Sequence, residues 1–161
     1  MTDDPFDKFA VNYDSWFERH RWAFLSELSA LRRVMPAGRG VEIGVGTGRF
    51  ASSLGITTGL DPSLPMLTMA RGRGINVVRG MAEALPFKDG AFDLALMVTA
   101  LCFVQDPSLA LTEARRVVRT GGTVLIAILD QDSPLGEFYL AKAAESRYYR
   151  NARFLTHAQL L

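Results

Sequence analysis

Five short apolar runs divide the chain, and each has the composition of a buried β-strand. They are Val41–Ile43, "TTGLD" at 57–61, Ile75–Arg79, Phe92–Thr99 and Gly121–Leu129. The fourth run is almost continuously apolar, as expected of a strand that is covered on both faces. The pattern therefore predicts a sheet with helices packed on both sides.

Helical periodicity fills the intervals between these runs. Leucine and valine side chains recur at helical spacing within 25–34, and Pro36 follows where the pattern ends. Asp106 and Pro107 are typical of an N-cap and a first helical position. The remaining segment "GMAEALPFKDGA", at 80–91, is predicted to be a loop. The expected helices are one ending near residue 34, then 50–54, 62–71, 106–119 and 135–149, with a further one that begins near Thr156.

Strands and helices alternate from Val41 to Leu129, and right-handed crossovers between such strands produce a parallel sheet. The predicted fold is therefore α/β, a Rossmann-like, doubly wound and mostly parallel sheet. We expect one domain over 1–161, with a helical lid and first helix in 1–38 and a cofactor-binding core in 39–161.

Composition narrows the class of protein. The 161 residues are 48% hydrophobic, and 18 basic residues balance 17 acidic ones, so no basic footprint for nucleic acid is present. A single cysteine, Cys102, excludes an internal disulfide framework and favours the cytoplasm. No apolar run reaches the roughly 20 residues of a membrane span, and no secretory signal begins the chain. No cluster has metal-ligand spacing, so no metal is expected.

Three alternating glycines follow the first predicted strand in "VEIGVGTGRF". Their spacing is G-x-G-x-G, and Arg49 stands where a dinucleotide-binding fingerprint would have its third glycine. Glu42, two residues before the loop, would repel a pyrophosphate but attract an ammonium or sulfonium group. Asp61 ends the next strand and could accept hydrogen bonds from both hydroxyls of a ribose. These residues favour a cationic nucleoside over a dinucleotide.

Several of these residues also have structural interpretations. The glycines could form only a tight strand-to-helix turn. Asp61 could be a helix N-cap, although Ser63 competes for that position. Glu83 could equally be a solvated loop charge. Tyr13 and Trp16, three positions apart, could simply dock the first helix on the sheet.

The ordered set of motifs resembles a known family. E-x-G-x-G-x-G is followed by "GLDPS", "GMAEALPF", "FDLALMVTALCFV" and "ARRVVRTGG". Together with the opening "VNYDSWFERH", this set resembles the class I S-adenosylmethionine-dependent methyltransferases of the small-molecule type, related to ubiquinone-biosynthesis methyltransferases. The resemblance covers nearly the whole chain.

The resemblance implies a role for each matching residue. The backbone of Gly44–Gly48 would contact the methionine part of the cofactor, Asp61 would hold the ribose, and 98–102 would face the transferred methyl group. Relatives often have an aspartate where this chain has Met81, so the contact with the adenine amino group would fall to Ala82 or Glu83. The implied cofactor-binding residues are Tyr13, Trp16, Glu42, Gly44, Val45, Gly46, Gly48, Asp61, Pro62, Ser63, Met66, Met81, Ala82, Glu83 and Val98.

The implied reaction is an in-line displacement on S-adenosylmethionine by a small-molecule methyl acceptor, with S-adenosylhomocysteine as product. The leaving group needs no protonation, and no convincing base is present, so no catalytic residue is assigned. Two alternatives remain: a catalytically silent cofactor-binding module acting through a partner, and a nucleotide-dependent oxidoreductase. The glycine spacing and Glu42 argue against the second.

The resemblance also implies strands beyond the fifth, whereas the sequence ends at Leu161 soon after "FLTHAQLL". We therefore expect a shortened form in which Gly121–Leu129 lies at a sheet edge. Such an edge would be covered by the 133–150 segment or by self-association with a second copy. We also expect the 1–34 segment to be mobile without the cofactor and ordered with it.

Overall fold

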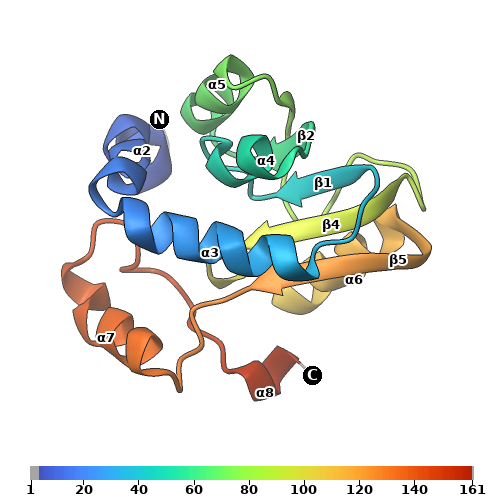
Figure 1. Cartoon of the computed structure of the whole chain (residues 1–161). Coiled ribbons are helices and arrows are strands. Elements are labelled where there is room, and N and C mark those ends of the chain that lie inside the picture. Colours follow the sequence, from blue (N-terminus) through green and yellow to red (C-terminus); the bar gives the residue numbers. More distant parts are fainter. Residues whose placement is uncertain (1–3, 161) are drawn as a thin grey trace.

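A computed structural model describes residues 4–160 of the chain as a sheet with helices on both faces (Figure 1). All five strands are parallel and lie in the order β3-β2-β1-β4-β5. This confirms the predicted fold class and the five predicted strands. Their bounds are Gly40–Ile43 (β1), Thr58–Asp61 (β2), Asn76–Arg79 (β3), Phe92–Val98 (β4) and Val118–Ala127 (β5).

Helices cover the two faces of the sheet unequally. α3 (Arg21–Val34), α4 (Arg49–Leu54) and α5 (Leu64–Gly72) pack on one face, and α6 (Pro107–Val117) packs on the other (Figure 1). β1 and β4 lie in the middle of the sheet, where the strand order reverses. Ligands of open α/β sheets bind at this reversal, beyond the carboxyl ends of the strands.

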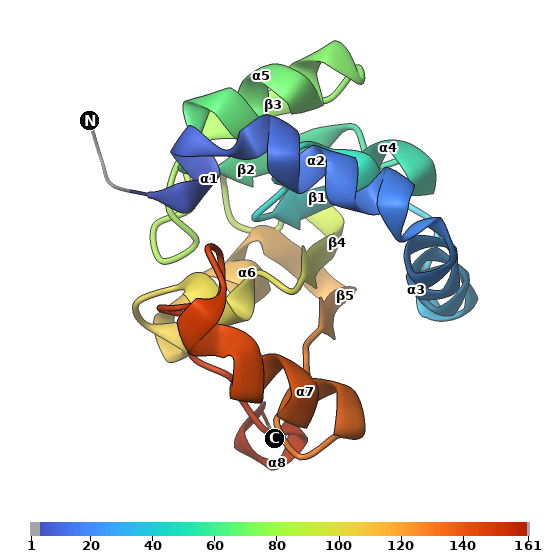
Figure 2. The same cartoon turned by 90° about the vertical axis from the view of Figure 1, so that its left-hand side faces the viewer.

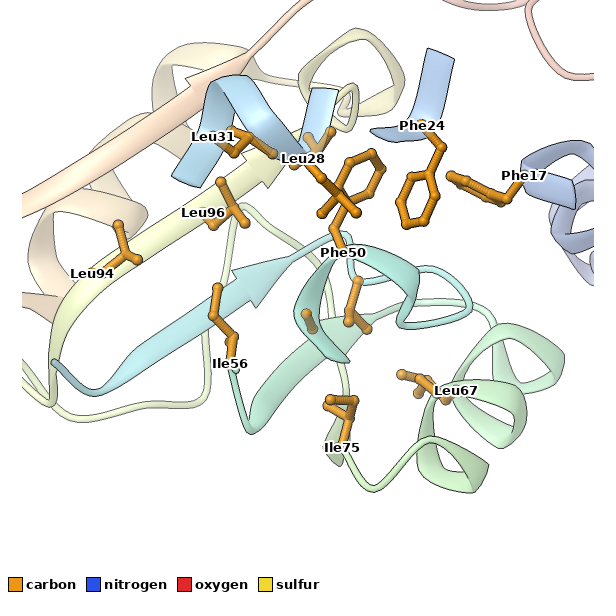
Figure 3. Close-up of a cluster of buried hydrophobic side chains, with 14 residues drawn as sticks. Phe17, Phe24, Leu28, Leu31, Phe50, Ile56, Leu67, Ile75, Leu94 and Leu96 are labelled. Carbon is orange, nitrogen blue, oxygen red and sulfur yellow. The ribbon is translucent and has the colours of Figure 1, made fainter. Parts of the chain in front are cut away.

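The near-continuous apolar composition of β4 reflects two separate cores. Side chains alternate between the faces of a strand, so Leu94 and Leu96 contribute to one core and Ala95 and Met97 to the other. Figure 3 shows the first core, in which Leu28 and Leu31 of α3 and Phe50 of α4 pack towards the sheet. The β4 residues are thereby fixed from both sides, which positions the chain that follows Val98.

The N-terminal segment forms three helices: α1 (Pro5–Lys8), α2 (Ala10–Arg19) and α3. Breaks at Phe9 and His20 separate them, because both residues leave the helical conformation. α1 and α2 cross the carboxyl ends of β1 and β2 in Figure 2. Residues 1–3 of the expected lid, and Leu161, lie outside the described residues.

The predicted boundary between α6 and β5 and the predicted end of β5 were wrong. α6 ends at Val117 rather than Arg119, because Val118 already pairs with Phe92 as the first residue of β5. The register then shifts between Phe92 and Leu94, and Gly121 adopts a φ of 78° in this irregular stretch. β5 ends at Ala127 rather than Leu129.

The predicted helix over 135–149 is also shorter than expected. α7 covers Pro134–Lys142, and a single 3-10 turn, η2 (Ala143–Glu145), follows it. The Ser146 hydroxyl accepts hydrogen bonds from the amides of Tyr148 and Tyr149, at 3.3 and 3.1 Å. Such local side-chain bonds compete with helix continuation.

The expected C-terminal helix is present as α8 (His157–Leu160). A reciprocal capping box starts it, in which the Thr156 amide donates to Gln159 Oε1 at 2.8 Å and the Gln159 amide donates to Thr156 Oγ1 at 3.3 Å. Within residues 4–160, no helix combines the length and hydropathy needed to cross a bilayer.

Candidate functional site

The glycine loop leaves β1 at the carboxyl edge of the sheet and is fixed to the neighbouring strand. The amides of Gly44 and Val45 both donate to the Leu60 carbonyl of β2, at 2.8 and 2.9 Å. Gly44 has a φ of 76°, and a Cβ added there would lie 2.5 Å from the Cβ of Ala100. Glycine is therefore required where the loop meets the segment that follows β4.

Gly46 presents the exposed side of this loop to the N-terminal helices. Its amide donates to Asp61 Oδ2 at 2.9 Å. An added Cβ would point towards Tyr13 Cε1, 3.9 Å away. Tyr13 therefore covers the bare backbone of the loop at Gly46.

Asp61 is buried at the end of β2 and binds two backbone amides. Besides Gly46, the amide of Ser63 donates to its Oδ1 at 2.9 Å. Burial raises the pKa of Asp61 to about 6, and the two amide hydrogen bonds limit the rise. Each carboxylate oxygen has a second lone pair, so both can accept a further hydrogen bond. The helix N-cap is Ser63 rather than Asp61, since the Ser63 hydroxyl accepts from the Met66 amide.

Glu42 is the second buried carboxylate of the site. Only 2% of this residue is exposed, and its Oε2 has no hydrogen-bond partner among the described residues. Burial raises the pKa of Glu42 well above its usual value, against the effect of a hydrogen bond from the Ala51 backbone, and the nearby charge of Asp61 raises it further. A buried carboxylate oxygen without a partner is costly unless a cation or donor reaches it. Glu42 therefore fits a ligand with an ammonium or sulfonium group.

Glu42 and the glycine loop line a small cavity under α2. The cavity holds about 20 Å³, which is room for about one water molecule. Its lining also includes Tyr13 and Phe17 from α2 and Val98 from the end of β4. A nucleoside-sized ligand could enter only if α2 moved away from the loop.

An ion-pair network joins α2 to the core beside this cavity. Asp14 accepts from Arg49 Nε and Nη2 at 2.9 and 2.6 Å and from Arg73 Nη2 at 2.9 Å. Arg73 Nη1 also donates to the Thr47 carbonyl of the glycine loop at 2.8 Å. These cations lower the pKa of Asp14 to about 2, against the opposing effect of burial. We call this group, Asp14 with Arg49 and Arg73, the lid latch.

Sequence reasoning missed the latch and Phe17. Tyr13 and Phe17 are four positions apart on α2 and therefore share one face of the helix. That spacing was a usable signal. The pairing of Asp14 with residues 35 and 59 positions away leaves no trace in the sequence pattern.

Some predicted site residues lie away from the cavity lining. Trp16 stacks on His20, with ring centroids 4.6 Å apart, and packs edge-on against Phe17. Pro62 accepts from Arg79 through its carbonyl, and Met66 is buried on α5. Met81 is 43% exposed and forms one isolated bridge with Ala84.

Glu83 has a structural partner. Its Oε1 accepts from the amides of Gln105 and Asp106 at 2.7 and 3.2 Å, which fixes the start of α6. Its Oε2 is buried and has no hydrogen-bond partner within residues 4–160. The neighbouring Ala82 is buried in the second core. Contact of Ala82 or Glu83 with an adenine stays a prediction.

The chain turns sharply after β4. Thr99 has a φ of 48°, a strained conformation for a β-branched residue and one that recurs at functional sites. The Cys102 thiol donates to the Thr99 carbonyl at 3.1 Å, and burial raises its pKa to about 12. The thiol is therefore protonated near neutral pH and is a poor nucleophile. The described residues contain no His, Cys, Asp and Glu group able to hold a metal ion.

A family model described as a methyltransferase domain matches residues 41–126, more than half of the chain. The chain belongs to the class I S-adenosylmethionine-dependent methyltransferases. It is therefore a methyltransferase enzyme whose cofactor is S-adenosylmethionine. Its relatives include quinone-biosynthesis enzymes.

Three similar proteins illustrate this membership. The protein MJ1123 of Methanocaldococcus jannaschii is 45% identical over 97% of this chain and 76% of its own length. A crystal structure from Thermotoga maritima, of a protein called a possible histamine N-methyltransferase, is 50% identical with a TM-score of 0.94 over 97% of this chain and 75% of that one. A demethylmenaquinone methyltransferase of Renibacterium salmoninarum is 34% identical over 79% of this chain. The chain spans only 56% of that relative.

Proposed function

We propose that this methyltransferase transfers the methyl group of S-adenosylmethionine to a small-molecule acceptor by in-line displacement. The observation that carries the proposal is the buried carboxylate of Glu42, whose Oε2 has no hydrogen-bond partner within residues 4–160, beside the bare backbone of the glycine loop. When bound, the cofactor supplies an electrophilic methyl group and leaves as neutral S-adenosylhomocysteine.

Residues of this chain would bind and orient the cofactor. Asp61 would accept hydrogen bonds from the ribose hydroxyls through lone pairs that its two amide contacts leave available. Glu42 would face the cationic end of the cofactor, near Val98 at the end of β4. The contacts of Trp16, Pro62, Met66 and Met81 with the cofactor stay predictions.

The helix α2, when it covers the bound cofactor, would also contribute to the rate of methyl transfer. Tyr13 and Phe17 cover the loop, and their rings exclude water from the reacting groups. Holding an acceptor close to the methyl group in a dry site lowers the entropic part of the barrier. We infer a cytoplasmic protein from its single cysteine, which leaves the chain without an internal disulfide.

Turnover assays test the proposal. The protein is incubated with S-adenosylmethionine carrying a labelled methyl group and with panels of small amines, phenols and quinols, and the labelled product is measured. We expect S-adenosylhomocysteine and methylated product in equal amounts with at least one panel. Binding of S-adenosylhomocysteine without turnover on any panel would favour the silent module, an alternative that the relatives do not favour.

A further inference from the structure

Arg49, the first residue of α4, lines the same small cavity as Glu42 and the glycine loop. Its side chain is only 19% exposed. The wall of the cavity therefore carries a cation as well as a carboxylate, and this cation is not among the cofactor-binding residues that the sequence implies.

Every partner of the Arg49 guanidinium among the described residues belongs to α2. Its Nε and Nη2 donate to the two oxygens of the Asp14 carboxylate at 2.9 and 2.6 Å, which is a bidentate pair. Its Nη1 donates to Glu18 Oε1 at 2.6 Å. Its central carbon lies 5.7 Å from the centre of the Phe17 ring. α2 and α4 lie side by side in Figure 2, in agreement with these contacts.

Entry of a nucleoside-sized ligand would take these partners away from Arg49, because α2 must leave the glycine loop to admit it. Arg73 differs in this respect, since its Nη1 also donates to the Thr47 carbonyl of the loop at 2.8 Å. A largely buried cation that loses its partner is destabilising. Arg49 therefore needs a new anionic partner in the ligand-bound protein, at the place where the Asp14 carboxylate now lies.

The Thr47 hydroxyl lies beside this place and is unused. Thr47 is 2% exposed and lines the cavity, and its Oγ1 forms no hydrogen bond with the described residues. It lies near Asp14, because it contributes to the lowered pKa of that carboxyl. A buried hydroxyl without a hydrogen bond is uncommon in folded proteins, so it points to a polar group that the ligand supplies.

The cavity thus presents a guanidinium and a hydroxyl together with the unpartnered Oε2 of Glu42. A zwitterionic amino acid carries the matching pair of charges, an α-carboxylate and an α-ammonium group. Within the cofactor, only the methionine part has both. The adenine and the ribose are neutral, and the sulfonium group has no negative charge to offer Arg49.

We propose that Arg49 binds the α-carboxylate of the cofactor, with the Thr47 hydroxyl as a second donor. Asp14 occupies this place in the ligand-free protein and gives up Arg49 when α2 moves, while Arg73 stays bound to the loop. Glu42 then pairs with the α-ammonium group. This inference rests on the proposed position of the methionine part at the glycine loop, and it adds the residues that recognise its carboxylate.

A pair of ligands that differ only in the carboxylate tests the inference without turnover. S-adenosylhomocysteine and its decarboxylated analogue, S-adenosyl-3-thiopropylamine, are titrated separately into the protein by calorimetry. We expect S-adenosylhomocysteine to bind about tenfold or more tightly, as hydrogen bonds between charged groups allow. The free energy of moving α2 is common to both ligands, so the ratio of their affinities reports the contact with the carboxylate.

Three variants assign this preference to Arg49. Arg49→Gln should abolish it, and binding of the decarboxylated analogue shows that the variant folds. Arg49→Lys should keep part of it, because lysine keeps the charge but cannot form a bidentate pair. Arg73→Gln is the matched control, since it removes the other cation of the lid latch but no residue of the cavity lining. It should keep the full preference.

The possible outcomes separate this inference from the proposed function. Equal affinities of the wild-type protein for the two ligands would overturn the inference alone. A preference that survives in Arg49→Gln, or that Arg73→Gln loses to the same extent, would contradict the role of Arg49. Failure of the wild-type protein to bind either ligand would contradict the proposed function, and the inference with it.

Discussion

Two buried carboxylates, Asp61 and Glu42, carry the chemistry of the site at the scale of single residues. Asp61 is held by two backbone amides and keeps one acceptor position on each oxygen. Glu42 has an oxygen with no partner among residues 4–160. The first can therefore accept hydrogen bonds from hydroxyl donors, and the second offers a negative charge to a cationic group.

Replacing Asp61 with asparagine should weaken cofactor binding. The asparagine side chain keeps the size of the aspartate but loses the charge, and one of its two terminal atoms becomes a donor. We expect Asp61→Asn to lower the affinity for S-adenosylhomocysteine by about 1.5–3 kcal/mol, the usual contribution of hydrogen bonds to a charged group. Calorimetric titration measures the difference. Asp89→Asn, at an exposed acid, is the matched control, and equal affinities for all three proteins would refute the assignment.

Cofactor affinity should rise with pH between about 5 and 7. The pKa of Asp61 is raised from 3.8 to about 6, so its carboxylate becomes fully available as an acceptor only above that pH. Asp4 and Asp7 contribute to this rise through their charges, and Glu42 is a neighbouring acid. The pH dependence of folding stability has the opposite sign. Because the pKa of Asp61 is higher in the folded protein than in the unfolded chain, its contribution to stability falls as the pH rises from about 4 to 6.

The measurement is a series of S-adenosylhomocysteine titrations at pH 5, 6 and 7. Asp61→Asn should show a flatter dependence than the wild-type protein, because its amide does not titrate. A wild-type affinity that is constant or falls over this range would contradict the role of the Asp61 carboxylate.

At the scale of elements, α2 is the part that must move. Its Tyr13 and Phe17 close the cavity to about 20 Å³, and the lid latch holds it there. Breaking a buried ion pair leaves the partner charges uncompensated, whereas exposed pairs contribute little. The latch therefore decides how readily α2 leaves the glycine loop.

Asp14→Asn should increase hydrogen exchange in α2 while leaving β4 protected. The loss of charge-assisted bonds to Arg49 and Arg73 should make opening of α2 easier by about 1.5–3 kcal/mol. Glu18→Gln is the control, since Glu18 pairs with Arg49 from a side chain that is 68% exposed. S-adenosylhomocysteine should slow exchange in α2 of both variants. Unchanged exchange in Asp14→Asn would show that ring packing alone holds the helix.

Local signals explain which elements the sequence could predict. The strands follow from apolar runs, and Asp106, Ser63 and Thr156 mark helix starts through their own capping bonds. The helix at 135–149 ends early because the Ser146 hydroxyl accepts hydrogen bonds from following backbone amides, and helix propensities do not predict such local bonds. The glycine loop, Glu42 and Asp61 were predictable from spacing. The lid latch was not, because its members are brought together only by tertiary packing.

At the scale of the whole molecule, the edge of the sheet at β5 affects how the protein could pair with another chain. Among residues 4–160, β5 pairs with β4 alone and forms one edge of the described sheet. α7 lies past the end of β5 in Figure 1 rather than along its open side. The other edge strand, β3, has only four residues, whereas β5 has ten. A long apolar edge offers unpaired backbone groups to another chain.

We therefore expect concentration-dependent self-association through β5. Light scattering across a dilution series should show a rising mass with concentration. Thr123→Lys should reduce the association, because a charge on an edge strand opposes pairing. A mass that stays that of a monomer throughout the series would show that β5 does not recruit a second copy.

A crystal structure with S-adenosylhomocysteine would decide whether this site binds the cofactor. We expect both ribose hydroxyls to donate to Asp61, the methionine part to lie on the Gly44–Gly48 backbone near Glu42, and the sulfur to face the space beyond Val98. We also expect Tyr13 to move away from Gly46 to admit the ligand. A ligand bound elsewhere, or one whose ribose makes no contact with Asp61, would contradict the proposed binding mode.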